Sequence, residues 1–161
     1  MYTHDQMLEL ISVAKAAKLS FPDDFAAASL DDLCKVCNGV GGASVPERLR
    51  KALTKAYACA QATAAIHDWR YEHSDGLPES QKKADNEFLK NGMAEVKYRH
   101  SNGGLWGWLH RLWDERKIVA AYRLLELGGE AAWCISFRDN FLKNAKSDCT
   151  EEKSSKPTSK F

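Results

Sequence analysis

The spacing of apolar residues constrains the fold of this chain more than any other feature. Apolar side chains recur three or four residues apart along almost the whole sequence, and alternating β-branched runs are scarce. This spacing places apolar residues on one face of a helix, whereas alternation is typical of strands. The pattern predicts an all-α protein. With 161 residues, 44% of them hydrophobic, the chain can bury one sizeable core, so we expect a single helical domain over residues 1–145.

Capping and chain-breaking residues divide this pattern into expected helices over residues 3–18, 24–36, 46–73, 78–100, 105–127 and 130–144. The glycine-rich segment 37–42 ends the second helix, because glycine favours the positive φ values of helix ends. Ser44 is a suitable cap for the third, with proline two residues later. Gly128-Gly129 is expected to stop the fifth helix. The polar segment 146–161 is predicted to be a disordered tail.

Charge and cysteine content bear on the partners and the compartment. Lysine and arginine number 23 against 22 acidic residues, so the net charge gives no reason to expect nucleic acid as a partner. The N-terminus lacks the apolar core of a signal peptide, and we expect synthesis in the cytoplasm. An odd number of cysteines, five, favours a reduced compartment. Cys34-x-x-Cys37 leaves a zinc site open as a less favoured alternative.

Two short motifs flank the turn expected at residues 74–78. HDWRY begins at His67, and ADNEF contains Asp85. Because residues four apart share a helix face, His67 and Tyr71 point the same way and Asp68 points to a neighbouring face. The turn makes the next helix antiparallel, which can bring Asp85 opposite His67. A carboxylate there would fix the tautomer of the imidazole. By itself, the pair His67-Asp68 is more often a polar surface pair.

The order of a glycine loop, CNGVGG, followed by HDWRY and ADNEF resembles the phospholipase A2 superfamily in its compact parvovirus-like and phage-borne forms. The longer segments IHDWRY, ADNEFLKN and AYRLLELGGEAAW are similar to small phage and prophage proteins of that kind. The likeness covers roughly residues 34–133. It implies a small helical domain in which two antiparallel helices carry the two motifs after a glycine-rich loop.

The resemblance also implies a reaction, the calcium-dependent hydrolysis of a glycerophospholipid ester. His67 would be the general base that takes a proton from the attacking water, a role that histidine commonly fills near neutral pH. Asp85 would hold and polarise His67, and Tyr71 would steady Asp85. The substrate would be a phospholipid membrane surface. Export, association with a virion, or contact with a phage particle or secretion partner would bring the protein to it.

A calcium site follows from the same resemblance. Asp68 would supply carboxylate oxygens, and the backbone carbonyls of Cys37, Gly39 and Gly41 would supply the others, since Ca²⁺ prefers oxygen ligands. The ion and the amide of Gly39 would stabilise the oxyanion that develops on the ester carbonyl. A second function class stays open, a catalytically silent domain that keeps the helical pair for a structural or binding role in a phage-related assembly.

Two features of the sequence need a structural answer. A straight helix from Pro46 would place His67 about 32 Å from its start, at ~1.5 Å per residue, too far for the glycine loop to reach Asp68. We therefore expect two helices, or a bend near Thr54.

The three tryptophans Trp106, Trp108 and Trp113 would suit a membrane interface, but core packing is expected for at least two of them.

Overall fold

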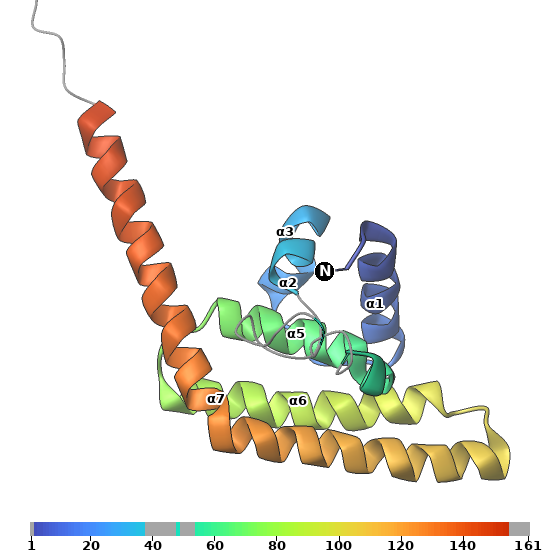
Figure 1. Ribbon diagram of the computed structural model, residues 1–161. Coiled ribbons are helices and arrows are strands. Elements are labelled where there is room, and N and C mark those ends of the chain that lie inside the picture. Colours follow the sequence, from blue (N-terminus) through green and yellow to red (C-terminus); the bar gives the residue numbers. More distant parts are fainter. Residues whose placement is uncertain (1, 38–47, 49–53, 155–161) are drawn as a thin grey trace, which may run out of the picture.

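The protein is built from helices (Figure 1). The structure, a computed structural model, describes residues 2–37, 48 and 54–154, and within these ranges it contains no strand. The all-α prediction is confirmed for this part of the chain. The elements are α1 (His4–Ala16), α2 (Asp23–Ala27), α3 (Leu30–Val36), the 3-10 helix η1 (Ala58–Ala60), α5 (Gln61–Glu72), α6 (Pro78–Arg99) and α7 (Gly104–Ser154).

Side-chain caps start two of the N-terminal helices. The hydroxyl of Thr3 accepts the backbone N–H of Gln6, and the Gln6 side chain accepts the N–H of Thr3 in return, which forms a capping box at α1. The single helix expected over residues 24–36 is instead two. Ser29 accepts the N–H of Asp32 and starts α3 after an extended residue, Ala28.

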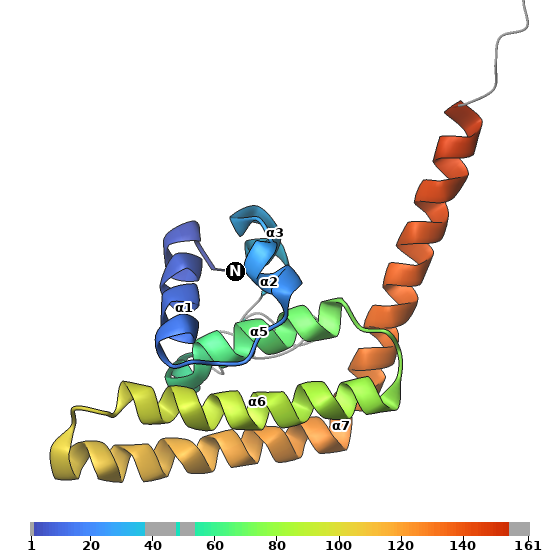
Figure 2. The same ribbon diagram turned by 180° about the vertical axis from the view of Figure 1, so that it is seen from behind.

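Helix α5 is central to the fold. In Figures 1 and 2, α1, α2 and α3 lie on one side of it, and α6 and the first part of α7 lie on the other. The N-terminal side holds a hydrophobic core in which Met7, Leu33, Ile66 and Trp69 are buried. The small residues Ala62, Ala64 and Ala65 are also buried, and they let neighbouring helices approach α5 closely.

The helix is interrupted before α5, as we expected from the distance between the glycine-rich loop and Asp68. Residues 54–56 are helical, Tyr57 leaves the helix, and η1 leads into α5. The break therefore lies at Tyr57 and η1, a few residues later than the position near Thr54 that we expected. The start of the predicted helix, residues 46–53 except residue 48, lies outside the described residues.

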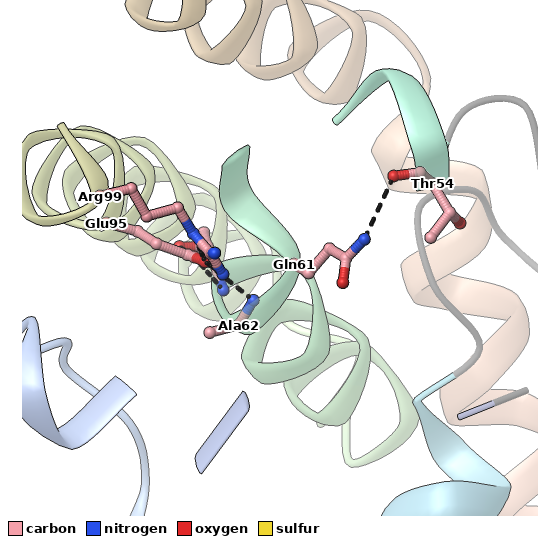
Figure 3. A network of polar contacts seen from close by, with 6 residues as sticks. Thr54, Gln61, Ala62, Glu95 and Arg99 are labelled. Carbon is pink, nitrogen blue, oxygen red and sulfur yellow. Dashed lines mark hydrogen bonds and ion pairs between the residues drawn. The ribbon is translucent and has the colours of Figure 1, made fainter. Parts of the chain in front are cut away.

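A side chain from α6 caps the start of α5 (Figure 3). The N-cap residue Ala60 makes no side-chain cap bond. Instead, the carboxylate of Glu95 accepts the backbone N–H groups of Ala62 and Thr63, at 3.3 and 2.8 Å, and the Thr63 hydroxyl at 2.9 Å. Glu95 is fully buried, and Arg99 donates to it through Nε and a terminal nitrogen at 3.0 and 2.8 Å. This carboxylate fixes the start of α5 against α6.

A tight turn makes α5 and α6 antiparallel (Figure 1). The N–H of Leu77 donates to the Asp75 carboxylate at 2.9 Å, and Pro78 opens α6 at its first turn. Gly76 has φ of +74°, and a Cβ there would lie 2.8 Å from the Phe137 ring, so both backbone and space require glycine. Helix α6 ends at Arg99, one residue before the predicted end.

Helix α7 is continuous from Gly104 to Ser154, so the predicted stop at Gly128-Gly129 is wrong. Its first part lies along α6, where Ile118 packs over Gly92, and it then turns away within its orange part (Figures 1 and 2). It also continues over residues 146–154, where we predicted a disordered tail, whereas residues 155–161 lie outside the described part. Glycine costs a helix only about 1 kcal/mol per residue, which packing on the neighbouring turns can offset.

The three tryptophans in the first turns of α7 are exposed, which corrects the expectation that at least two of them belong to the core. The exposed fractions are 74% for Trp106, 53% for Trp108 and 62% for Trp113. The face of α7 that packs on α6 is formed by other residues, among them Gly107 and Ile118, which are both buried. None of the described helices contains an apolar stretch that could span a lipid bilayer.

Candidate functional site

A buried hydrogen-bonded cluster joins α5 to α6. Nε2 of His67 lies 3.0 Å from Oδ1 of Asp85, and the hydroxyl of Tyr71 donates to the same oxygen at 2.8 Å. Gln81 donates to the other carboxylate oxygen at 3.3 Å. His67 is 8% exposed and Asp85 is 4% exposed. The helix face shared by His67 and Tyr71 therefore meets Asp85 across the antiparallel pair. Below, the His–Asp–Tyr cluster means His67, Tyr71 and Asp85.

Aromatic rings hold this cluster in place. The Tyr71 ring lies beside the imidazole of His67 with 4.4 Å between ring centroids, and Phe88 meets it edge-on at 5.1 Å. Trp133 of α7 meets Tyr71 edge-on at 5.0 Å. Such tilted contacts fix the direction of each ring. The imidazole is thus held by packing as well as by its bond to Asp85.

Tyr71 can only donate to Asp85. Burial raises the pKa of Tyr71, and the charge of the Asp85 carboxylate and its hydrogen bond raise this pKa further. The phenol therefore stays protonated around neutral pH. Its proton faces the carboxylate, which supports the expected positioning role of Tyr71 without giving it a role as a base.

Helix α7 closes one side of the cluster with a glycine. Gly129 is buried, and a Cβ added there would lie 2.5 Å from the Tyr71 hydroxyl and 3.0 Å from Nε2 of Gln81. Sequence reasoning took this glycine for a helix stop and did not single out Gln81 or Trp133. Gln81 had a signal, since it lies one helical turn before Asp85. No local sequence signal marks Gly129 or Trp133, because their contacts join distant parts of the chain.

Asp68 lies on a neighbouring face of α5, half-buried, towards the end of α3. Burial is the main cause that raises the pKa of both Tyr2 and Cys37, and in each case the carboxylate of Asp68 is near enough to add to the shift. The thiol of Cys37 donates to the carbonyl of Ala65 at 3.3 Å, which ties the end of α3 to α5. The structure thus brings Cys37, where the expected glycine loop starts, close to Asp68.

The remainder of the expected calcium site, Gly39 and Gly41 with the amide of Gly39, lies outside the described residues. Among those that are described, no group of three or more His, Cys, Asp or Glu side chains is placed to hold a metal ion. The expected site needs one carboxylate and several backbone carbonyls. The position of Asp68 near Cys37 agrees with part of this arrangement. For zinc, Cys34 and Cys37 are both buried with free thiols, and no described group completes a site.

Little open space adjoins His67 in the described part of the protein. The depression lined by His67, Thr63 and Phe88 is too small to admit a water molecule. A larger hollow of about 190 Å³ lies nearby and is lined by residues such as Trp69, His73 and Trp133, but not by His67 or Asp85. His73 and two carboxylates, Asp24 and Asp75, line the hollow, but the hydrogen bond of His73 that is seen among the described residues goes to the Trp69 carbonyl, so the candidate acid–base pair is the one in the cluster.

No protein-family model matches the chain, and no curated protein or solved structure matches it at a significant level. The described residues form an all-helical fold with a buried His–Asp–Tyr cluster between two antiparallel helices. Membership of the phospholipase A2 superfamily stays a prediction.

Proposed function

We propose that the protein hydrolyses a glycerophospholipid ester in a calcium-dependent, phospholipase A2-like reaction, with water activated by His67. The observation that carries this proposal is the bond between His67 Nε2 and Asp85, which is shared with Tyr71 and buried between α5 and α6. A histidine oriented by a carboxylate is a common arrangement in general-base catalysis. The resemblance of HDWRY and ADNEF to that superfamily supplies the substrate class.

In the proposed reaction each member of the cluster has a separate role. With its Nε2 proton donated to Asp85, His67 carries the lone pair on Nδ1, which has no hydrogen-bond partner among the described residues. Nδ1 would take a proton from water as that water attacks the ester carbonyl, and would pass it to the leaving alcohol. Asp85 holds the tautomer and stabilises the imidazolium, while Tyr71 keeps the carboxylate in place.

Calcium would be held by Asp68 and by the carbonyls of Cys37, Gly39 and Gly41. When bound, the ion supplies positive charge to the oxyanion that forms on the ester. The charge of Asp68 adds to the effect of burial on the pKa of Cys37, and this supports the assignment, because the carboxylate then acts on the residue at the start of the loop. Burial of the Cys37 thiol against α5 would anchor the loop and leave its backbone to face the ion.

The test is hydrolysis of phospholipid in mixed micelles, with calcium and with a chelator. We expect activity with calcium only, and His67→Ala should lower it by about 10²–10⁴-fold, the usual contribution of a general base. His73→Ala is the matched control, since His73 is an exposed histidine next to the end of α5 and should keep full activity. Wild-type turnover in purified His67→Ala would remove this histidine from the mechanism.

One observation favours the second candidate, a catalytically silent domain with a structural or binding role in a phage-related assembly. The depression at His67 does not admit water among the described residues, so the cluster can also be a polar device that aligns α5 with α6. In that case wild-type protein shows no hydrolysis under either condition. His67→Ala and Asp85→Asn would then change only the melting temperature.

A further inference from the structure

Helix α7 carries an apolar face that no other described element covers. Six large side chains over two turns are exposed, namely Leu105, Trp106, Trp108, Leu109, Leu112 and Trp113. At about 100° per residue they fall within an arc of roughly 160°. Ile118, which is fully buried, points to the opposite side, towards α6. An exposed apolar patch of this kind is typical of a binding surface.

The patch lies in a basic part of the chain. Residues 97–117, which span the α6–α7 turn, contain five basic and two acidic residues, a net charge of +3. The other 18 basic and 20 acidic residues leave the rest of the chain at −2. The apolar face and the positive charge therefore coincide at one end of the helical pair.

One cation lies within the apolar face itself. Arg116 is exposed, and it follows Leu112 and Trp113 by four and three residues, which places it on their side of α7. Arg111 and Lys117 are paired with Glu115 and Asp114, whereas Arg116 makes no ion pair among the described residues. Its guanidinium is therefore available to an anionic group above the tryptophans.

We propose that this face of α7 docks the protein on an anionic phospholipid surface, with the helix lying along the interface. Indole suits the boundary between apolar chains and water, and arginine extends to lipid phosphates while its methylenes stay among the apolar side chains. A second copy fits less well, because a two-fold contact centred here would bring two Arg116 side chains together.

This inference deepens the proposed function, since both place the protein at a phospholipid surface. It does not need hydrolysis, because the face lies on α7 and contains no member of the His–Asp–Tyr cluster. His67→Ala protein should therefore bind vesicles as wild type does. Binding without turnover would count against the proposed function alone, and turnover of dispersed lipid without vesicle binding would count against the docking surface alone.

The experiment is flotation of the full chain with vesicles in the presence of a chelator. One set is pure phosphatidylcholine and the other contains about one third phosphatidylglycerol, which supplies the negative surface that basic residues attract. We expect stronger binding to the second set and a blue shift of tryptophan fluorescence. The double variant Trp106→Ala/Trp113→Ala should bind at least about tenfold more weakly, since each indole offers 150–250 Å² of burial at most.

Two further variants separate apolar from charge effects. Arg116→Gln should reduce the preference for phosphatidylglycerol while keeping the fluorescence shift. Leu8→Ala/Leu77→Ala is the control, because both leucines are about half exposed and lie outside the patch, and it should bind as wild type does. The proposal is overturned if wild type does not float, or if the tryptophan variant floats equally well. A third result would also overturn it. In that result, light scattering shows that the wild type is a dimer and the tryptophan variant a monomer, and the wild type does not bind vesicles.

Discussion

Residue 129 of α7 is a glycine, and only its hydrogen atom lies between the helix backbone and the His–Asp–Tyr cluster. A Cβ there would lie 2.5 Å from the Tyr71 hydroxyl, a distance that real Cβ atoms do not adopt. The phenol ring is rigid, so it can yield only by weakening its 2.8 Å bond to Asp85. Gly129 therefore connects the packing of α7 to the geometry of the site.

We predict that Gly129→Ala destabilises the protein although alanine is the better helix former. Overpacking costs about 1–3 kcal/mol, and the gain in helix propensity is about 1 kcal/mol, so the net loss should be up to about 2 kcal/mol in urea unfolding. If the cluster is catalytic, turnover should fall as well. Glu130→Ala, an exposed neighbour on α7, is the control and should change neither quantity. Equal or greater stability in Gly129→Ala would show that α7 is not packed against Tyr71.

Residue positions in the cluster were predictable where helical periodicity alone decides them. His67 and Tyr71 share a face at any helix geometry, and a short turn returns the chain so that Asp85 meets them. The contact of Gly129 was not predictable, since it depends on where a helix 40 or more residues later crosses the site. Loop positions Gly39 and Gly41 lie outside the described residues, so their assignment stays a prediction.

At the scale of elements, the start of α5 depends on a carboxylate from α6. Glu95 is fully buried and accepts from two α5 backbone N–H groups and from Arg99, whose side chain is 30% exposed. A buried charge so placed is stabilised by the helix dipole as well as by its partners. Removing the Glu95 carboxylate leaves the α5 backbone N–H groups and the Arg99 guanidinium without their partner. This loss costs more stability than the ion pair itself contributes.

We predict that Glu95→Gln lowers the free energy of unfolding by about 2–4 kcal/mol, since one partner of a buried pair is lost. Arg99→Gln should cost less, because the Glu95 carboxylate keeps its bonds to Ala62 and Thr63. Urea titrations followed by circular dichroism give both values. The control is Glu126→Gln, because the ion pair of Glu126 with Arg123 is exposed and solvent screens it. A loss in Glu95→Gln no larger than in this control would contradict the capping role.

A second link holds α6 to α7. Asp114 lies 2.9 Å from Nε2 of His100 and 2.7 Å from Nζ of Lys117. Burial acts to raise the pKa of Asp114, but the bonds to Lys117 and His100 outweigh it and hold this pKa below the ordinary value of 3.8. A carboxyl group whose pKa is lower in the folded state stabilises the fold above its ordinary pKa, and this stability is lost as the pH falls through the folded value.

Asp114→Asn should therefore lower stability by about 1 kcal/mol at pH 7. The difference from wild type should persist down to about pH 4 and shrink below it, because wild-type Asp114 then becomes protonated and loses the same interactions. Thermal melts of both proteins between pH 2.5 and 7, an interval chosen around the ordinary value of 3.8, measure this. Asp139→Asn, on an exposed pair with Arg138, serves as the control. A constant difference across the whole range would contradict the link.

Helix boundaries were predictable where a local signal sets them and missed where two signals compete. The start of α6 follows from Pro78, and its end lies within one residue of the prediction. Ser29 was a cap signal that a continuous apolar pattern concealed, so α2 and α3 were read as one helix. At Gly128-Gly129 the local cost of glycine is about 1 kcal/mol each, too small to stop a helix whose next turn buries Trp133.

At the scale of the whole molecule, α5 separates the surroundings of Asp68 from the His–Asp–Tyr cluster. Asp68 faces the N-terminal helices near Cys37, whereas the His–Asp–Tyr cluster faces α6 and α7. A calcium ion at Asp68 would therefore bind only when the N-terminal helices are packed on α5. Folding of that half and binding of the ion are then coupled, and an ion that binds only the folded state must stabilise it.

We therefore predict that calcium raises the melting temperature of wild-type protein. For a site as weak as about 1 mM, 10 mM calcium contributes about 1.4 kcal/mol, which is a rise of about 3–6 °C for a chain of this size. Asp68→Asn should lose this response because it removes the only side-chain ligand of the proposed site. Asp85→Asn is the matched control, since it should keep the calcium response while losing hydrolysis. Magnesium at the same concentration should have less effect, because it gives up its water ligands reluctantly. A wild-type melting temperature that ignores calcium up to about 10 mM, well above the weakest usual affinities, would leave the silent domain as the better account of the His–Asp–Tyr cluster.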